Sequence, residues 1–132
     1  MNLENDMSPI ILVLEDVAET REGIEKLLKG DGYRVQVAKD ELDAILCARQ
    51  QSPDLILVSL AGLPRDMVDT GCRIRERADL GEDVPIVLFC IDDICEGDEV
   101  AIGRNVYLTR PDNFNQLRSL LSRLLPEVPA AA

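Results

Sequence analysis

The sequence predicts a single α/β domain in which a parallel β-sheet is covered by helices on both faces. Five short apolar runs alternate with helical patterns along the 132 residues of the chain. Strands that are buried on both faces read as continuous apolar runs, and right-handed crossovers between parallel strands place helices over the sheet. A chain of this length has room for one core. We expect the domain to span residues 9–125, between a flexible N-terminal tail (1–8) and a C-terminal tail (126–132).

The apolar runs differ in a way that predicts their places in the sheet. "IILVL" and the run in "PDLILVS" are uniformly apolar, as strands in the middle of a parallel sheet are. "YRVQVA" alternates polar and apolar residues, which predicts an edge strand. The five expected strands are Ile10–Leu14, Tyr33–Ala38, Leu55–Val58, Val84–Cys90 and Val106–Thr109.

Each expected strand is followed by a segment with helical character. The first, Val17–Gly30, places Val17, Ile24, Leu27 and Leu28 on one face and ends at the stop signals Gly30 and Gly32. The second begins at a capping residue, Asp40, and is expected to bury Leu42, Ile45 and Leu46. The third, Met67–Arg77, carries an apolar stripe of Met67, Ile74 and Ala78.

The last two segments differ in how clearly their sequences predict a helix. "DDICEGDEVAIGR" is acidic and interrupted by glycine, so its helix is expected to be short or irregular. "NFNQLRSLLSRLL" gives the clearest helical pattern in the chain, with Phe114, Leu117, Leu121 and Leu124 at helical spacing.

Composition excludes several classes of function. The 25 acidic residues outnumber the 14 basic ones and give a net charge of −11, which argues against nucleic acid or an anionic membrane as a partner. The chain has no histidine, so no histidine-based nucleophile system or metal site can form. Its four cysteines form no C-x-x-C pair, and neither a signal peptide nor a membrane-length apolar stretch is evident. We expect a reduced, cytoplasmic protein.

Polar residues stand where the expected strands end. Glu15 and Asp16 follow the first strand, Ser59 ends the third, Cys90 ends the fourth, and Thr109, Arg110 and Pro111 close the fifth. In open parallel sheets, ligands and chemistry gather at the carboxyl ends of the strands. These residues are therefore the candidate functional site.

In that order, these segments resemble the receiver domain of bacterial two-component response regulators. The resemblance covers about Pro9 to Leu125 and is carried by "ILVLEDV", "PDLILVSL", "VPIVLFC" and "YLTRP" at compatible spacings. It implies a flavodoxin-like (CheY-like) fold with strand order 2-1-3-4-5 and helices on both faces.

The resemblance also implies a role for each residue at the strand ends. Glu15 and Asp16 fall on paired acids that help to hold Mg²⁺, and Ser59 falls on the aspartate that accepts a phosphoryl group from a histidine kinase. Cys90 falls on a threonine or serine that contacts this group, and Tyr107 on an aromatic switch residue. Arg110-Pro111 falls on a Lys-Pro pair whose lysine senses the phosphoryl group. The chain thus departs from the pattern at Ser59, Cys90 and Arg110, as a degenerate receiver (pseudo-receiver) would.

The serine is the departure with the largest chemical consequence. Phosphoryl transfer in this family needs an ionised oxygen nucleophile beside a metal ion. A serine hydroxyl is a poor nucleophile without a base, and no histidine is present to act as one. Cys90 likewise replaces a strong hydroxyl donor by a weak S–H donor. We interpret Cys90 as a buried thiol in preference to one half of a redox pair with Cys95.

Loss of the aspartate also weakens the expected Mg²⁺ site, because Mg²⁺ prefers two or more carboxylates. One hypothesis is that Arg110 closes on Glu15 or Asp16 and neutralises them in the metal's place. The alternative is that Arg110 points to solvent and both acids are hydrated.

The sequence therefore favours a receiver-like domain that is not an enzyme and acts through protein contacts independently of phosphorylation. Its expected partners are a histidine kinase, an output domain or another regulator, and a homodimer through the face of the fourth helix, fifth strand and fifth helix is a further expectation. One alternative is a working receiver that is phosphorylated at an unorthodox residue. A more distant alternative is a small-ligand-binding α/β module, although the chain has no glycine-rich phosphate loop.

Overall fold

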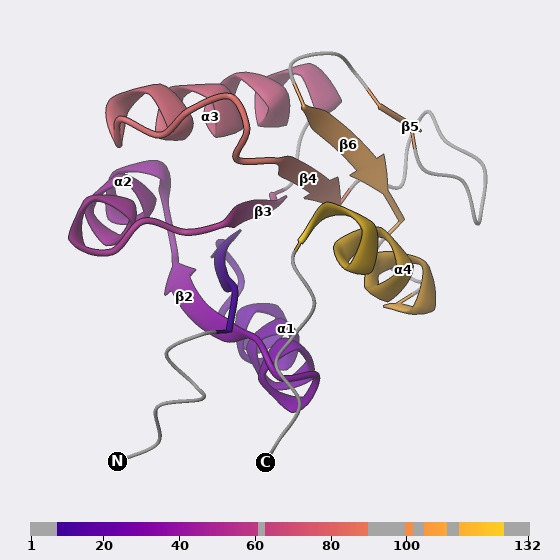
Figure 1. Ribbon diagram of the computed structural model, residues 1–132. Coiled ribbons are helices and arrows are strands. Elements are labelled where there is room, and N and C mark those ends of the chain that lie inside the picture. The colour runs from indigo at the N-terminus through magenta and orange to yellow at the C-terminus, as the bar shows by residue number, and fades with distance from the viewer. Residues whose placement is uncertain (1–7, 61–62, 90–99, 102–104, 111–113, 126–132) are drawn as a thin grey trace.

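A mixed six-stranded sheet forms the centre of the domain (Figure 1). This computed structural model describes residues 8–60, 63–89, 100–101, 105–110 and 114–125. The strand order is β2-β1-β3-β4-β6-β5, and the first five of these strands run parallel. The predicted five-stranded parallel sheet of order 2-1-3-4-5 is therefore confirmed. The strands are β1 (Ile10–Glu15), β2 (Arg34–Ala38), β3 (Leu55–Ser59), β4 (Ile86–Phe89), β5 (Val100–Ala101) and β6 (Val106–Thr109).

The short strand β5 differs from the sequence prediction. Val100–Ala101 lies within the segment expected to contain an irregular helix, but it pairs antiparallel with β6 at Leu108 and Tyr107. An added edge strand satisfies backbone groups of β6 that would otherwise lack a partner in the sheet. The preceding part of that segment, residues 90–99, lies outside the described residues.

Two helical layers cover the sheet, as predicted. Figure 1 shows α2 (Glu41–Gln50) and α3 (Pro64–Arg77) on one face and α1 (Ala18–Gly30) and α4 (Phe114–Leu124) on the other. Alternate residues of the same strands supply the two cores. In β1, Leu12 and Leu14 face the α2–α3 layer, whereas Ile11 and Val13 face the α1–α4 layer.

The predicted helix ends of the first two helices are confirmed. α1 ends at Gly30, and Gly32 adopts a φ of 99°, a conformation that favours glycine. The Asp40 side chain accepts a hydrogen bond of 2.8 Å from the backbone N–H of Asp43 and so caps α2.

Of the three residues predicted to be buried on α2, only Ile45 is buried. Leu42 and Leu46 are 66% and 50% exposed, whereas Ala44, Ile45 and Ala48 are buried. The two alanines join the core on this face of the sheet, and the leucines are left on the outer side of the helix. In the first and last helical segments, Ile24, Leu28, Leu117 and Leu121 are buried as predicted, whereas Val17 is 53% exposed and Phe114 is 40% exposed.

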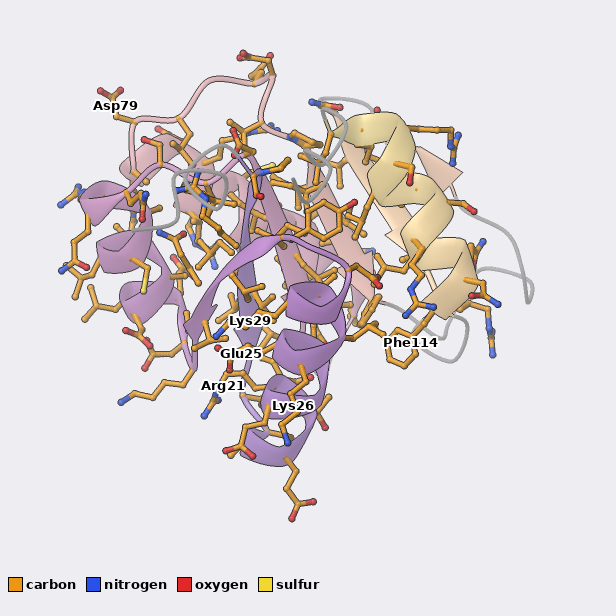
Figure 2. The ribbon with its side chains drawn as sticks, turned by 60° about the horizontal axis from the view of Figure 1, so that its bottom comes forward. Arg21, Glu25, Lys26, Lys29, Asp79 and Phe114 are labelled. Carbon is orange, nitrogen blue, oxygen red and sulfur yellow. The ribbon has the colours of Figure 1, made fainter. Side chains whose placement is uncertain are left out.

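Helix α3 is held at its end and along its outer side by polar contacts. The helix ends at Arg77, and Asp79, whose φ is 60°, projects from the loop that follows (Figure 2). The Leu80 N–H donates to the Arg75 carbonyl at 2.8 Å, a bond of the kind that closes helix ends. Arg73 of α3 makes a two-point pair with Glu41 of α2, with N–O distances of 2.9 and 2.7 Å. Among the residues that the structure describes, no helix is long and apolar enough to cross a membrane.

Candidate functional site

The candidate site lies where the parallel strands β1 and β3 end. Glu15 is the last residue of β1, and Ser59, the last residue of β3, is its direct partner in the strand register. The sheet thereby brings together two residues that are 44 positions apart in the chain. On the far side of β4, Thr109 ends β6 opposite Phe89.

Glu15 is the buried acid of this site. Its side chain is only 4% exposed, and both carboxylate oxygens accept hydrogen bonds. The Ser59 hydroxyl donates to Oε1 at 2.7 Å, and the backbone N–H of Val17 donates to Oε2 at 3.0 Å. A buried carboxylate needs such donors because its desolvation is costly. Ser59 therefore fixes the orientation of Glu15.

The start of α1 is built around the same acid. The Arg21 guanidinium donates to the backbone carbonyl of Glu15 at 2.7 Å, one turn into the helix. The Val17 side chain provides no helix cap, so the Glu15 carboxylate takes a place near the positive end of the α1 dipole. Sequence patterns missed Val17 and Arg21. The one sequence feature that could have indicated their contacts with Glu15 is that the predicted helix begins directly after this acid.

Asp16, the second predicted acid, does not join this network. It is exposed and makes no hydrogen bond or ion pair within the described part of the chain. Glu15 and Asp16 are therefore neighbours in sequence with different surroundings, one buried and bonded and the other in solvent.

The remaining predicted residues lie along the end of β6. Tyr107 is half-buried, and its hydroxyl donates to the Asn105 side chain at 2.9 Å. Thr109 is fully buried, and its hydroxyl has no hydrogen-bond partner within the part of the chain that the structure describes. Arg110 is half-buried. Cys90 and Pro111 lie outside the described residues, as does Cys95.

The hypothesis that Arg110 neutralises the acids is not supported. The carboxylate contacts of Glu15 are the Ser59 hydroxyl and the Val17 N–H, and within the described residues Arg110 pairs with neither Glu15 nor Asp16. The physical reason is register: Ser59 is adjacent to Glu15 in the sheet, whereas Arg110 follows a strand two positions further across.

The acids do not form a site that fits Mg²⁺. This cation needs several oxygen ligands in nearly octahedral geometry. Both oxygens of Glu15 already accept hydrogen bonds, and the hydroxyl hydrogen of Ser59 points at one of them. No group of three or more acidic or cysteine side chains that could hold a metal ion occurs among the described residues.

Two curated proteins are similar to nearly the whole chain. It is 34% identical over 128 residues to the sensor histidine kinase AruS of Pseudomonas aeruginosa, covering 92% of this chain and 12% of AruS. It is 29% identical over 127 residues to the response regulator MprA of Mycobacterium tuberculosis, covering 92% of this chain and 54% of MprA. No protein-family model matches the chain.

A solved structure of a receiver domain has the same fold as this chain. The receiver domain of another Pseudomonas aeruginosa sensor histidine kinase, solved with a magnesium ion coordinated in its active-site cleft, superposes with a TM-score of 0.62. The sequence identity is 25%, and the match covers 89% of this chain and 97% of that one. The chain is a domain of the receiver type.

The receiver-type domain makes up only part of the curated relatives that it matches, about an eighth of AruS and about half of MprA. The activities and partners of those whole proteins are therefore not transferred to it directly. What the comparisons share with the structure is the fold. In this chain, Glu15 and Ser59 meet at the ends of two strands of that fold.

Proposed function

We propose that this chain is a receiver-type domain of two-component signalling in which Ser59 stands in the place of the phosphoacceptor aspartate. On this proposal the domain works through protein contacts, without accepting a phosphoryl group and without acting as an enzyme. The observation that carries it is the 2.7 Å hydrogen bond from Ser59 to Glu15. The bond gives the serine a structural task, which is to satisfy a buried carboxylate.

The same geometry explains why loss of phosphorylation would be tolerated by the fold. In a receiver with an aspartate at this position, two or three carboxylates would meet here and would need a metal ion to offset their repulsion. A serine replaces that repulsion by an attractive, charge-assisted hydrogen bond. The domain can therefore keep one buried acid in place with no cation.

The proposed partners are proteins, namely a histidine kinase, an output domain or another regulator. The large acidic excess of the chain supports a protein over nucleic acid or an anionic membrane. A second copy that docks through β6 and α4 is an additional proposal, in which the exposed Phe114 would lie at the edge of the contact.

A second candidate function is phosphorylation at Ser59 itself. The hydrogen bond favours it in one respect, because the Glu15 carboxylate is placed where a general base would accept the hydroxyl proton. Against it, the other carboxylate oxygen is already bonded to the Val17 N–H, and the described residues contain no group that could hold a metal ion.

Incubation with acetyl phosphate and Mg²⁺, followed by intact mass spectrometry, separates the two candidates. We expect no phosphoryl adduct on the wild-type protein. A stable adduct that disappears in a Ser59→Ala variant would overturn the proposal and establish the second candidate. An adduct that persists in Ser59→Ala would point to another acceptor and would also contradict the proposal.

A further inference from the structure

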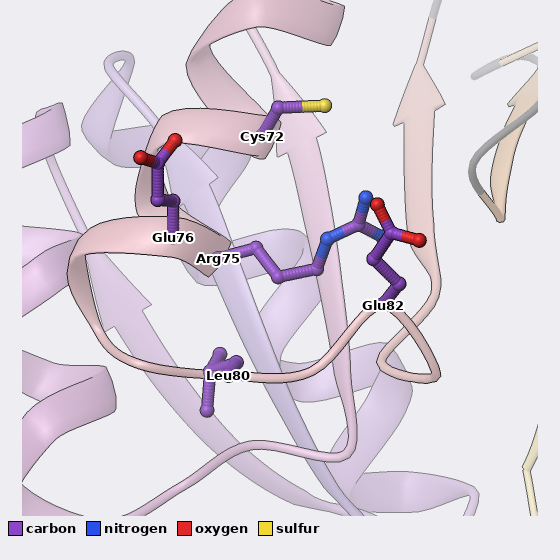
Figure 3. Close-up of a pocket in the computed structure, with 5 residues that line it drawn as sticks. All are labelled: Cys72, Arg75, Glu76, Leu80 and Glu82. Carbon is purple, nitrogen blue, oxygen red and sulfur yellow. The ribbon is translucent and has the colours of Figure 1, made fainter.

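The pocket beside the C-terminal half of α3 contains its own counter-charges (Figure 3). It has a volume of about 350 Å³ and is lined, among the described residues, by Cys72, Arg75, Glu76, Leu80 and Glu82. Arg75 is buried and donates to the Val84 carbonyl at 3.0 Å, and two carboxylates line the same pocket. A buried cation that has carboxylates beside it is already compensated, so the described lining calls for no ligand.

The open feature of the domain is the edge of the sheet at β2. At the other edge, β6 is covered by the antiparallel strand β5, whereas β2 pairs only with β1 among the described residues. Figure 1 shows β2 at one end of the sheet, between α2 and α1. Both helices pack against β1 as well as β2, so they cover the two faces of this strand rather than its outer edge.

The peptide groups of Val35 and Val37 point away from β1. The Arg34 N–H donates to the Pro9 carbonyl at 3.0 Å, so Arg34 and every second residue after it turn their peptide groups toward β1. The two valines therefore present their N–H and C=O groups at the outer edge. Within the described residues these groups meet no backbone partner, and the one contact there is the Cys47 thiol, 3.8 Å from the Val37 carbonyl oxygen. Such groups on an edge strand are a template for another strand.

The open stretch is bounded on both sides by bonds within the chain. The Tyr33 N–H donates to the Leu28 carbonyl at 3.1 Å, and the Lys39 N–H donates to the Asp43 carboxylate at 3.1 Å. The segment Val35–Val37 is thus the part of this edge whose N–H groups are available. It is symmetric about its central residue, because one outward-facing valine lies on each side of it.

This segment also lacks the features that usually keep edge strands apart. Native edges are blunted by charged side chains, by proline or by bulges. Val35, Gln36 and Val37 are uncharged, and the register of β2 with β1 is continuous along the strand. Valine, a β-branched residue, favours strand pairing. The sequence of the segment therefore favours the addition of a further strand.

We propose that the segment Val35–Val37 pairs with the same segment of a second copy of this chain, antiparallel and about a two-fold axis at Gln36. Val35 of each copy then lies opposite Val37 of the other, and each such pair exchanges both of its N–H···O bonds. A second copy is the occupant because the open groups are self-complementary, so that one axis satisfies all of them at once. The dimer depends on the edge alone and stands independently of the proposed function and of the contact through β6 and α4.

The charges beside the segment suit this arrangement. Residues 29–34, before it, carry two positive and one negative side chain, and residues 39–43, after it, carry one positive and three negative side chains. Because the strands run antiparallel, the positive start of each β2 adjoins the negative end of the other. The start is also hollowed, with a volume of about 420 Å³ that is lined by Lys29, Gly32, Tyr33, Arg34 and Val35. Side chains of the second copy can enter this hollow.

The flanking helices fit the same arrangement. α1 and α2 each lie over both β1 and β2. In the joined sheet, each of these helices and its counterpart in the second copy are therefore about two strand spacings apart, or about 10 Å, which is a usual distance between packed helices. The helices of the two copies can thus pack side by side on both faces of the joined sheet.

Sedimentation velocity over a range of protein concentrations tests the proposal. We expect a dimer whose share rises with concentration in the wild-type protein. Val37→Pro removes an outward N–H but no bond to β1, and it is expected to weaken dimerisation at least about tenfold. Val37→Ala keeps the N–H and is the matched control, which is expected to dimerise within about threefold of the wild type. Circular dichroism of each variant shows whether it is folded.

A disulfide at the axis reports the register directly. Residues that face each other between two hydrogen-bonded pairs have Cα atoms about 4.5 Å apart, which is within disulfide range. We expect Gln36→Cys, in a Cys47→Ala background, to form on mild oxidation a dimer whose peptide map contains a link between the two residues 36. Arg34→Cys in the same background is the control, because its counterparts are more than about 13 Å apart and should not link.

Three results would overturn the proposal. One is a protein that stays monomeric at every concentration and forms no link between residues 36. Another is a dimer that is unchanged in a folded Val37→Pro variant. The third is a dimer that is lost in Phe114→Ala and gives no such link, which would place the contact at β6 and α4. If Val37→Pro does not fold, the link at residue 36 decides, because the cysteine variants keep every backbone N–H.

Discussion

Ser59 and Glu15 are direct register partners on adjacent parallel strands, and the serine hydroxyl donates to the buried carboxylate at 2.7 Å. The pair joins the ends of β3 and β1 just before α1 begins. On the proposed function, Ser59 stands in the place of a phosphoacceptor, and the bond to Glu15 gives it a structural role instead.

Ser59→Ala is expected to destabilise the domain by about 1.5–3 kcal/mol, the usual worth of a hydrogen bond to a buried charged group. The change leaves Glu15 buried with one donor, the Val17 N–H, in place of two. Urea unfolding followed by circular dichroism measures the loss. Ser122→Ala is the control, because Ser122 is exposed and, among the described residues, its hydroxyl bonds only to the Arg118 carbonyl of its own helix. Equal stabilities of the two variants would show that the Ser59–Glu15 bond contributes nothing.

Ser59→Asp is expected to create a dependence of stability on Mg²⁺ that we do not expect of the wild-type domain. The new carboxylate would lie against Glu15, and the repulsion between two adjacent acids lowers stability until one is protonated or a cation binds. Thermal unfolding with and without millimolar MgCl₂ measures the effect. We expect Mg²⁺ to raise the melting temperature of Ser59→Asp, because a ligand that binds only the folded state stabilises it.

The wild-type protein and Ser59→Ala serve as controls for that experiment, with NaCl added at the same ionic strength. Neither is expected to respond to Mg²⁺ beyond its response to NaCl. Strong stabilisation of the wild-type domain by Mg²⁺, lost in a Glu15→Gln variant, would mean that Glu15 and Asp16 hold the metal without an aspartate at position 59.

The link between α2 and α3 predicts a pH dependence of stability at the acid end. The hydrogen bond from Arg73 lowers the pKa of Glu41 below its usual value of 4.5, with a smaller contribution from the nearby positive charges. A carboxyl group whose pKa is lower in the folded state stabilises the fold above the unfolded pKa. This contribution is lost as the pH falls through the folded pKa.

The difference in free energy of unfolding between the wild type and Glu41→Gln should therefore be constant above about pH 5 and should shrink as the pH falls below 4.5. The difference should be small and should decrease with salt, because the pair lies at the surface. Repeating the comparison in an Arg73→Met background should remove most of the pH dependence. A difference that grows as the pH falls would contradict the assignment.

The sequence was sufficient to predict the five parallel strands because the pattern of each apolar run indicates whether its strand is central or at an edge. A uniformly apolar run such as Ile10–Leu14 is stable only where both faces are covered, and the alternating run at Arg34–Ala38 is stable at an edge. The face of α2 could not be predicted in the same way. Leucine outweighs alanine in any hydrophobic pattern, but close packing against the sheet favoured Ala44 and Ala48 over Leu42 and Leu46.

The sequence was sufficient to select Glu15 and Ser59 as residues of the site, but not to predict the hydrogen bond between them. Glu15 and Ser59 were both selected because they end strands of the sheet, but the only partner considered for Glu15 or Asp16 was Arg110, with hydrated acids as the alternative. The hydrogen bond depends on the register between β1 and β3 and on the rotamer of a buried acid, neither of which is encoded in a local pattern. The strand at Val100–Ala101 was missed because two residues are too few to form a period.

The approach of α3 to β4 predicts opposite effects for two similar glycine substitutions. A Cβ atom at Gly71 would lie 2.8 Å from Cγ2 and 3.2 Å from Cδ1 of Ile86, a fully buried side chain, whereas nothing lies within 4 Å of a Cβ at Gly23 of α1. Alanine is favoured over glycine inside helices by up to about 1 kcal/mol. Gly23→Ala should therefore stabilise the domain, while Gly71→Ala should destabilise it by about 1–3 kcal/mol, as overpacking does.

Urea unfolding of the two variants and of Gly71→Ala/Ile86→Ala checks this explanation. Ile86→Ala alone creates a cavity and should cost about 2–5 kcal/mol. In the double variant the added methyl group occupies part of that cavity, so the combined loss should be smaller than the sum of the single losses. Additive losses, or a stabilising Gly71→Ala, would show that α3 can move away from β4 and that the close approach at Gly71 does not fix its position.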